Sequence, residues 1–211
     1  MWHELAAALQ ETLYMVTVST VFSVLSGFAL AVVMVLTCAR GLRPNAAVYA
    51  TLDLLVNLLR SFPFIILMIA IIPLTRFVAG TSIGSTASIV PLTIAATPFA
   101  ARIMEGSLME VDAGVVEAAR SFGARDLRIV FGVMVPEAMP SIVLNIAVVA
   151  INLLGCSAMA GAVGGGGLGD LAVKYGYNRF QTDVMAYSVL ALVAVVQVIQ
   201  GVGTAIYRRM R

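Results

Sequence analysis

Few side chains in this 211-residue sequence could act as nucleophiles, general bases or metal ligands. The only histidine, His3, lies at the N-terminus, and the two cysteines, Cys38 and Cys156, fall within apolar stretches. Covalent catalysis needs a nucleophile beside a base, and a metal site needs clustered ligands. We therefore expect no catalytic residue, no metal site and no cofactor-binding residue in this chain, which is not expected to be an enzyme.

One segment does match a nucleotide-binding spacing. The run Gly164-Gly165-Gly166-Gly167-Leu168-Gly169 satisfies the pattern G-x-G-x-x-G. That pattern binds a dinucleotide where it follows a β-strand and opens a helix, whereas here it follows a long apolar stretch. We expect a sharp turn that brings Asp170, Lys174 and Tyr175 to the surface.

A second pattern lies within an apolar stretch. Asn145, Val149, Asn152, Cys156 and Met159 recur at a helical spacing, which predicts that they share one face. Polar residues inside a membrane helix usually face protein. Two interpretations stay open: the asparagines join helices by hydrogen bonds, or this face lines a pathway with the flexible Met159 as part of a gate.

The composition places these patterns in a membrane, because 61% of the residues are hydrophobic and 11% charged, against about 25% charged in soluble domains. Charged residues are absent from 12–39, 77–101, 138–169 and 184–207. A spanning helix needs roughly 20 apolar residues, so a shorter gap at 61–75 must be extended past Arg60, which should lie near headgroups or against protein. We expect one all-α membrane domain over 1–211, with five transmembrane helices at about 13–38, 54–75, 82–101, 139–162 and 184–206.

The basic residues predict the orientation, because cytoplasmic loops of membrane proteins are enriched in Lys and Arg. One side of the membrane would hold Arg40, Arg43, Arg102, Arg120, Arg125, Arg128, Arg208, Arg209 and Arg211. The other side would hold Arg76, Lys174 and Arg179. We expect the C-terminus in the cytoplasm and the N-terminus outside. The net charge of +2 is too small to favour nucleic-acid binding.

The segment 102–137 is too long and too charged for a simple connection between helices. Asp112 can cap a short helix that Gly123 ends, with Val115, Ala119 and Phe122 on its apolar face. A pattern of this kind is typical of a helical hairpin on the membrane surface or of a docking element for a cytoplasmic partner.

This segment also resembles a known motif. Glu117-Ala118-Ala119, then Gly123, then Val133 and Val135-Pro136 are similar to the EAA loop of ABC importer permeases, with valine at both aliphatic positions. Further segments resemble the methionine importer permeases of that family: 60–67, 73–76, 80–84, 157–164 and 175–177. The five expected spans agree with the small type of this permease fold.

The resemblance implies a permease subunit of an ATP-driven importer in a bacterial inner membrane, which translocates L-methionine, and it leaves open whether D-methionine is also translocated. It implies a second copy of the chain, two cytoplasmic ATPase subunits that bind ATP and Mg, and an extracytoplasmic substrate-binding protein. Glu117, Ala118, Ala119, Arg120 and Gly123 would then form the coupling helix that contacts the ATPase. Asn145, Asn152, Ser157 and Met159 would line the translocation path.

Three alternatives remain. A permease for another amino acid or small organic solute is the nearest, because the binding protein largely sets specificity in such importers. A secondary transporter usually keeps ionisable groups inside its spans, and only Arg60 qualifies here. A membrane enzyme would need a nucleophile with a base, or paired carboxylates, at membrane depth, and no expected span contains Asp, Glu or His near its centre.

Overall fold

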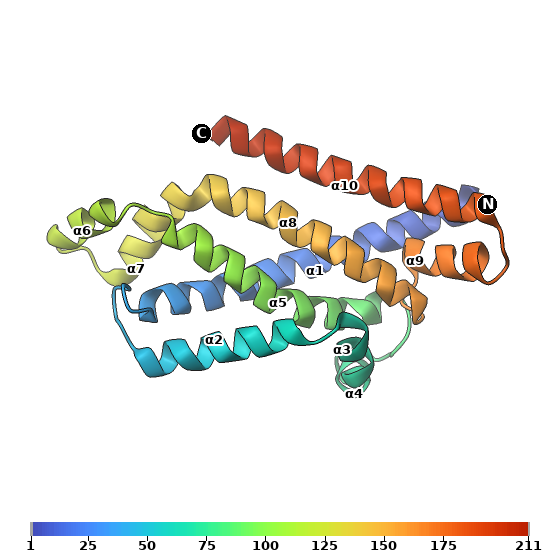
Figure 1. Ribbon diagram of the computed structural model, residues 1–211, viewed down its shortest axis with the longest axis horizontal. Helices are drawn as coiled ribbons and strands as arrows, with labels where there is room; N and C mark the ends of the chain where they lie inside the picture. Colours follow the sequence, from blue (N-terminus) through green and yellow to red (C-terminus); the bar gives the residue numbers. More distant parts are fainter. Residues whose placement is uncertain (1, 211) are drawn as a thin grey trace.

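The computed structural model describes residues 2–210, and every element in that range is helical. Figure 1 shows an elongated bundle of long helices, with bounds α1 (Trp2–Thr37), α5 (Ser85–Met109), α8 (Val135–Ala162) and α10 (Thr182–Met210). Each is long and apolar enough to cross a membrane, α8 together with the helical residues from Asp126 onward. The expected all-α membrane fold is confirmed.

The segment expected to be the second span is broken. α2 (Ala46–Ser61) begins after Asn45, whose side chain accepts the N–H of Val48 at 3.2 Å. It ends before Phe62, which is extended because Pro63 disfavours the helical conformation in the residue that precedes it. α3 (Phe64–Ala70) then departs at 99° from α2. The span expected over 54–75 is therefore interrupted at Phe62 and Pro63, and a fifth candidate span exists where α2 and α3 are taken as one bent pair.

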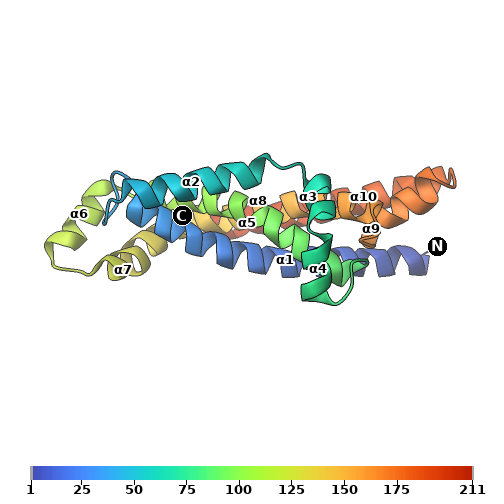
Figure 2. The ribbon, with the colours of Figure 1, turned by 90° about the horizontal axis from the view of Figure 1, so that it is seen from below.

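The bend carries two short helices across the bundle. α3 and α4 (Ile72–Ala79) run crosswise to the long helices in Figures 1 and 2. α4 ends at Gly80, whose φ of +74° is the left-handed conformation in which glycine commonly ends helices. Pro91 and Pro98, by contrast, lie within the continuous helix α5.

Short elements connect the long helices at both ends of the bundle. α6 (Ala113–Ser121) and α7 (Asp126–Ile129) lie at one end (Figure 2), and α7 continues through the π-helical segment η1 (Val130–Met134) into α8. At the other end, α9 (Gly167–Leu171) and the π-helical segment η2 (Ala172–Tyr177) connect α8 to α10. The two ends of the chain lie toward opposite ends of the bundle in Figure 1.

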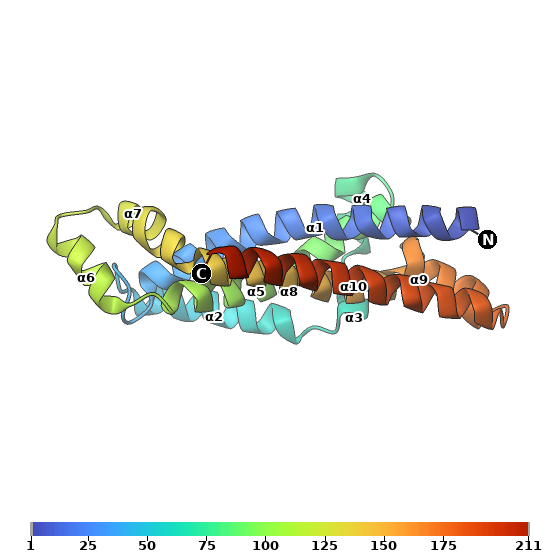
Figure 3. The same ribbon diagram turned by 90° about the horizontal axis from the view of Figure 1, so that it is seen from above.

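The core is formed chiefly by α1, α5 and α8. Gly27 lets α1 approach α5 closely, because a Cβ at Gly27 would lie 2.7 Å from Ala100 Cβ and 2.8 Å from the Ala101 nitrogen. α10 is the uppermost helix in Figure 1 and lies in front of α8 in Figure 3, which is seen from above, and it buries few side chains. Its exposed apolar residues, among them Leu190, Val193, Val198 and Val202, suit contact with lipid.

Candidate functional site

The ends of α6 are fixed by the residues that the sequence predicts. Asp112 Oδ1 accepts the backbone N–H of Gly114 at 2.7 Å. Gly123 has a φ of +77°, and its N–H donates to the carbonyl of Arg120 at 3.0 Å. The predicted start and end of this helix are therefore confirmed, although α5 runs to Met109 and makes the connection shorter than the expected 102–137.

The apolar face predicted for α6 is partly wrong. Val116 and Ala119 are the residues that pack against the bundle core, whereas Val115 is 44% and Phe122 90% exposed. The helix is rotated relative to the expectation because it packs on α7 and η1. Glu117, Ala118 and Arg120 are also exposed. α6 thus presents apolar and charged side chains that nothing else within residues 2–210 covers.

The segment that follows α6 along the chain, α7 and the start of η1, is fixed to the bundle by an ion pair and by buried side chains. Asp126 at the start of α7 forms an ion pair with Arg43 in the connection between α1 and α2. Ile129 and Val130 follow at 0% exposure and pack with Met104 and Leu108 of α5. A force applied to α6 would therefore reach α1, α5 and α8 through buried contacts.

The residues expected to share one face of α8 are divided between buried and exposed positions by the packing of the neighbouring helices. Asn145 Nδ2 donates to Ser107 Oγ at 2.7 Å and to the carbonyl of Ile103 at 3.3 Å, both on α5. Val149, one turn later, has 0% exposure. For Asn145 the observed contacts are those of the helix-joining interpretation.

Asn152 and Met159 lie on the exposed part of α8. Both are exposed, Met159 by 50%, and they share an open face of α8 with Val148 and Gly155 at helical spacing. Ser157 does not belong to this face. It is 1% exposed, and its hydroxyl donates to the carbonyl of Leu154 at 2.8 Å.

A charged network that the sequence does not predict joins α2 and α5. Arg102 donates to Glu105 Oε2 at 2.8 Å and also pairs with Asp53. Tyr49 donates from its hydroxyl to Glu105 Oε1 at 3.0 Å, and Glu105 is 2% exposed. The sequence does contain polar pairs at helical spacing, because Asp53 and Asn57 are one helical turn apart and Arg102 and Glu105 are three residues apart. It does not show that α2 and α5 pack together and so bring Arg102 to Asp53.

The other groups singled out by sequence have structural partners. Arg60 lies near the end of α2, with its guanidinium carbon 6.0 Å from the centre of the Phe99 ring. Within the glycine run, Gly164, Gly166 and Gly167 have positive φ, and Glu11 of α1 accepts the N–H of Gly167 at 2.7 Å. The run forms a tight turn into α9, as expected.

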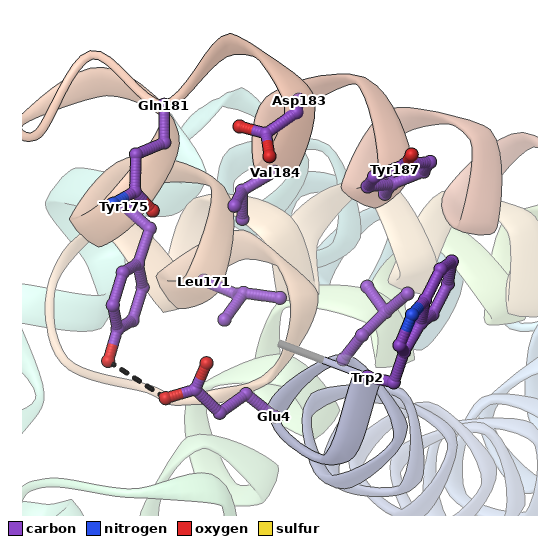
Figure 4. A pocket seen from close by; sticks show the side chains of 9 residues that line it. Trp2, Glu4, Leu171, Tyr175, Gln181, Asp183, Val184 and Tyr187 are labelled. Atoms are coloured by element: carbon purple, nitrogen blue, oxygen red, sulfur yellow. Dashed lines mark hydrogen bonds between the residues drawn. The ribbon is translucent and has the colours of Figure 1, made fainter.

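A cavity of about 420 Å³ opens at the end of the bundle that carries this turn. Figure 4 shows Trp2 and Tyr187 on one side of it and Tyr175 opposite, with the Tyr175 hydroxyl donating to Glu4 at 3.2 Å. Asp183 and Gln181 complete the polar lining. Exposed aromatic side chains beside charged groups are typical of a surface that contacts another protein.

No group of His, Cys, Asp and Glu side chains within residues 2–210 has an arrangement suited to a metal ion. The candidate site consists of three surfaces: the exposed side of α6 at one end of the bundle, the exposed face of α8, and the aromatic cavity at the other end. Such surfaces can transmit force and admit a solute.

Comparison with known proteins supplies a family for this arrangement. Residues 27–211 match the family described as the binding-protein-dependent transport system inner membrane component. The chain is 46% identical to the probable D-methionine transport system permease protein MetI of Vibrio cholerae, over 98% of this chain and 92% of that one. It is 42% identical to the methionine import system permease protein MetP of Bacillus subtilis, over 96% and 91% of the two chains.

The fold has an equally similar counterpart among solved structures. A structure of the MetNI methionine ABC transporter in inward-facing conformations superposes with a TM-score of 0.98 at 43% identity, covering 100% of this chain and 97% of that chain. The bent pair α2–α3, the projecting α6 and the glycine turn thus belong to a fold that this transporter also has.

Proposed function

The chain belongs to the family of binding-protein-dependent transport system inner membrane components, and we therefore propose that it is the permease subunit of an ATP-driven importer of methionine. The observation that carries the proposal is the identity of 38–46% to methionine permeases over nearly the whole chain. The exposed helix α6 agrees with the coupling role. ATP and Mg would bind to a partner subunit.

The exposed face of α8 supports assembly with a second copy of the chain. Four spans and one bent pair leave the face of α8 around Asn152 and Met159 open. An open polar and flexible face can border a path when a second copy closes it. We propose a homodimer with two ATPase subunits on α6 and a substrate-binding protein at the opposite end.

The proposed orientation places α6 and the C-terminus in the cytoplasm and the N-terminus outside, in a multi-pass protein of the bacterial inner membrane. Arg120, Arg125 and Arg128 lie on or beside α6 and α7, and the positive-inside rule favours this end for the cytoplasm. The aromatic cavity lined by Trp2, Tyr175 and Tyr187 then faces the binding protein.

Uptake by the reconstituted complex tests the substrate. Proteoliposomes that contain the permease, its ATPase and the binding protein are expected to accumulate labelled methionine when ATP is supplied. Unlabelled L-methionine and D-methionine should be compared as competitors with a panel of other amino acids and small organic solutes. If another solute competes and methionine does not, the alternative substrate is correct and the coupling role of α6 still stands.

Met159→Ala is expected to raise the leak of methionine severalfold in proteoliposomes without ATP. The side chain is half exposed on the open face of α8, and a flexible thioether can fill a narrow gap that alanine leaves open. Met109→Ala is the matched control, because Met109 is 52% exposed but lies at the end of α5 near α6. Equal leak in both variants would contradict a gate at Met159.

A further inference from the structure

A cavity of about 530 Å³ opens between the C-terminal end of α1 and the start of α7. Its lining residues are Leu36, Arg43, Arg125, Asp126 and Leu127. Arg43 pairs with Asp126, whereas Arg125 is exposed and has no ion pair within residues 2–210. One basic charge in the lining is therefore not compensated.

The surroundings of this cavity combine basic and apolar side chains. Arg128 on α7 is also exposed and unpaired within the described chain. Leu127 and Phe131, one helical turn apart, are 60% and 54% exposed. The Phe131 ring lies 6.4 Å from that of Phe28 on α1, so an apolar surface continues from the cavity along α1.

The cavity lies at the ends of two helices that are long and apolar enough to cross a membrane. Leu36 is the last residue but one of the candidate span Trp2–Thr37, and Leu127 is the second residue of the candidate span Asp126–Ala162. Phospholipid headgroups lie at the ends of such spans. The exposed residues of α6, in contrast, lie outside both spans, which separates this cavity from the surface proposed to contact the ATPase.

We infer that this cavity binds the headgroup of an anionic phospholipid. The guanidinium of Arg125 would donate to the phosphate oxygens, a geometry that its planar fork matches, and the acyl chains would lie against Leu127 and Phe131. Basic pockets at the cytoplasmic ends of spans favour acidic lipids. Since α7 directly follows the connection from α6, a bound lipid would hold the base of that helix at the membrane surface.

Lipid retention tests the inference directly. The complex purified from membranes would be placed in phosphatidylcholine nanodiscs that contain phosphatidylglycerol, and the phosphatidylglycerol bound to it titrated by native mass spectrometry. Arg125→Gln is expected to weaken the tightest binding about fivefold, the effect of one basic side chain near an anionic membrane surface, and raised salt should weaken it too. Arg125→Lys should keep most of the affinity.

Arg208→Gln is the matched control, because it removes one exposed basic charge at the same end of the bundle but from α10. An equal loss in both variants would mean bulk attraction to the membrane and would overturn the site. Loss of the ATPase subunit from Arg125→Gln with unchanged lipid would overturn it in favour of a protein contact. The measurement needs no transported substrate, so a wrong substrate assignment would leave its result intact.

Discussion

Uptake is expected to fall at least tenfold when Glu117 is replaced by lysine, while the permease still inserts and binds a second copy. Glu117 is exposed on α6, and its side chain makes no hydrogen bond or ion pair within residues 2–210. Reversing its charge therefore costs the fold little. At a complementary interface, like charges placed together cost several kcal/mol, and about 1.4 kcal/mol already corresponds to tenfold.

ATP-driven uptake and co-purification of the ATPase subunit are the two measurements. Glu137→Lys is the matched control, because Glu137 is an exposed glutamate at the same end of the bundle but on α8. Normal uptake by Glu117→Lys would contradict the coupling role. An equal loss of uptake in Glu137→Lys would show that any added positive charge at this end of the bundle lowers uptake, without a specific role of α6.

The backbone at Gly123 allows the same interface to be probed without a change of charge. A Cβ at this position meets nothing within 4 Å, so a substitution is constrained by the φ of +77° and by the N–H that donates to the carbonyl of Arg120. Asparagine tolerates that conformation, whereas proline is held near −65°. Gly123→Asn should therefore transport and Gly123→Pro should not, if the orientation of α6 matters for coupling.

The features predicted well from sequence are those set by local chemistry. The long helices follow from stretches without charge, and the limits of α6 follow from a cap at Asp112 and a glycine at Gly123 that tolerates positive φ. The break near Pro63 was also foreseeable as a bend. Its angle of 99° was not, because the direction of a chain after a break is set by what α3 packs against.

The features missed depend on which helices meet. A helical face can be computed from spacing, but the line between its buried and exposed parts is set by the neighbouring helix. Asn145 and Asn152 lie on one predicted face, yet Asn145 bonds to α5 and Asn152 is exposed. Val116, and not Val115, packs α6 on the core for the same reason. Spacing alone therefore could not separate a structural asparagine from one that borders a path.

The missed network between α2 and α5 carries the largest expected effect on stability. Glu105 is 2% exposed, and its two carboxylate oxygens accept from Arg102 at 2.8 Å and from Tyr49 at 3.0 Å. Removing one member of a buried ion pair leaves an uncompensated charge and costs about 3–5 kcal/mol. The lower end applies here, because the side chain of Arg102 keeps 27% of its surface exposed.

Arg102→Gln is therefore expected to destabilise the permease by about 3 kcal/mol and to lower its midpoint of thermal unfolding by roughly 6–12 °C. Arg76→Gln is the control, since Arg76 is exposed on α4 and has no ion pair within the described chain. A double variant, Arg102→Met with Glu105→Met, removes the buried pair and leaves only Asp53, whose side chain is 36% exposed to solvent. It should recover much of the loss, because apolar residues can replace a buried pair at little cost. If the double variant were as unstable as Arg102→Gln, the cost would lie in lost packing and not in a charge left without its partner.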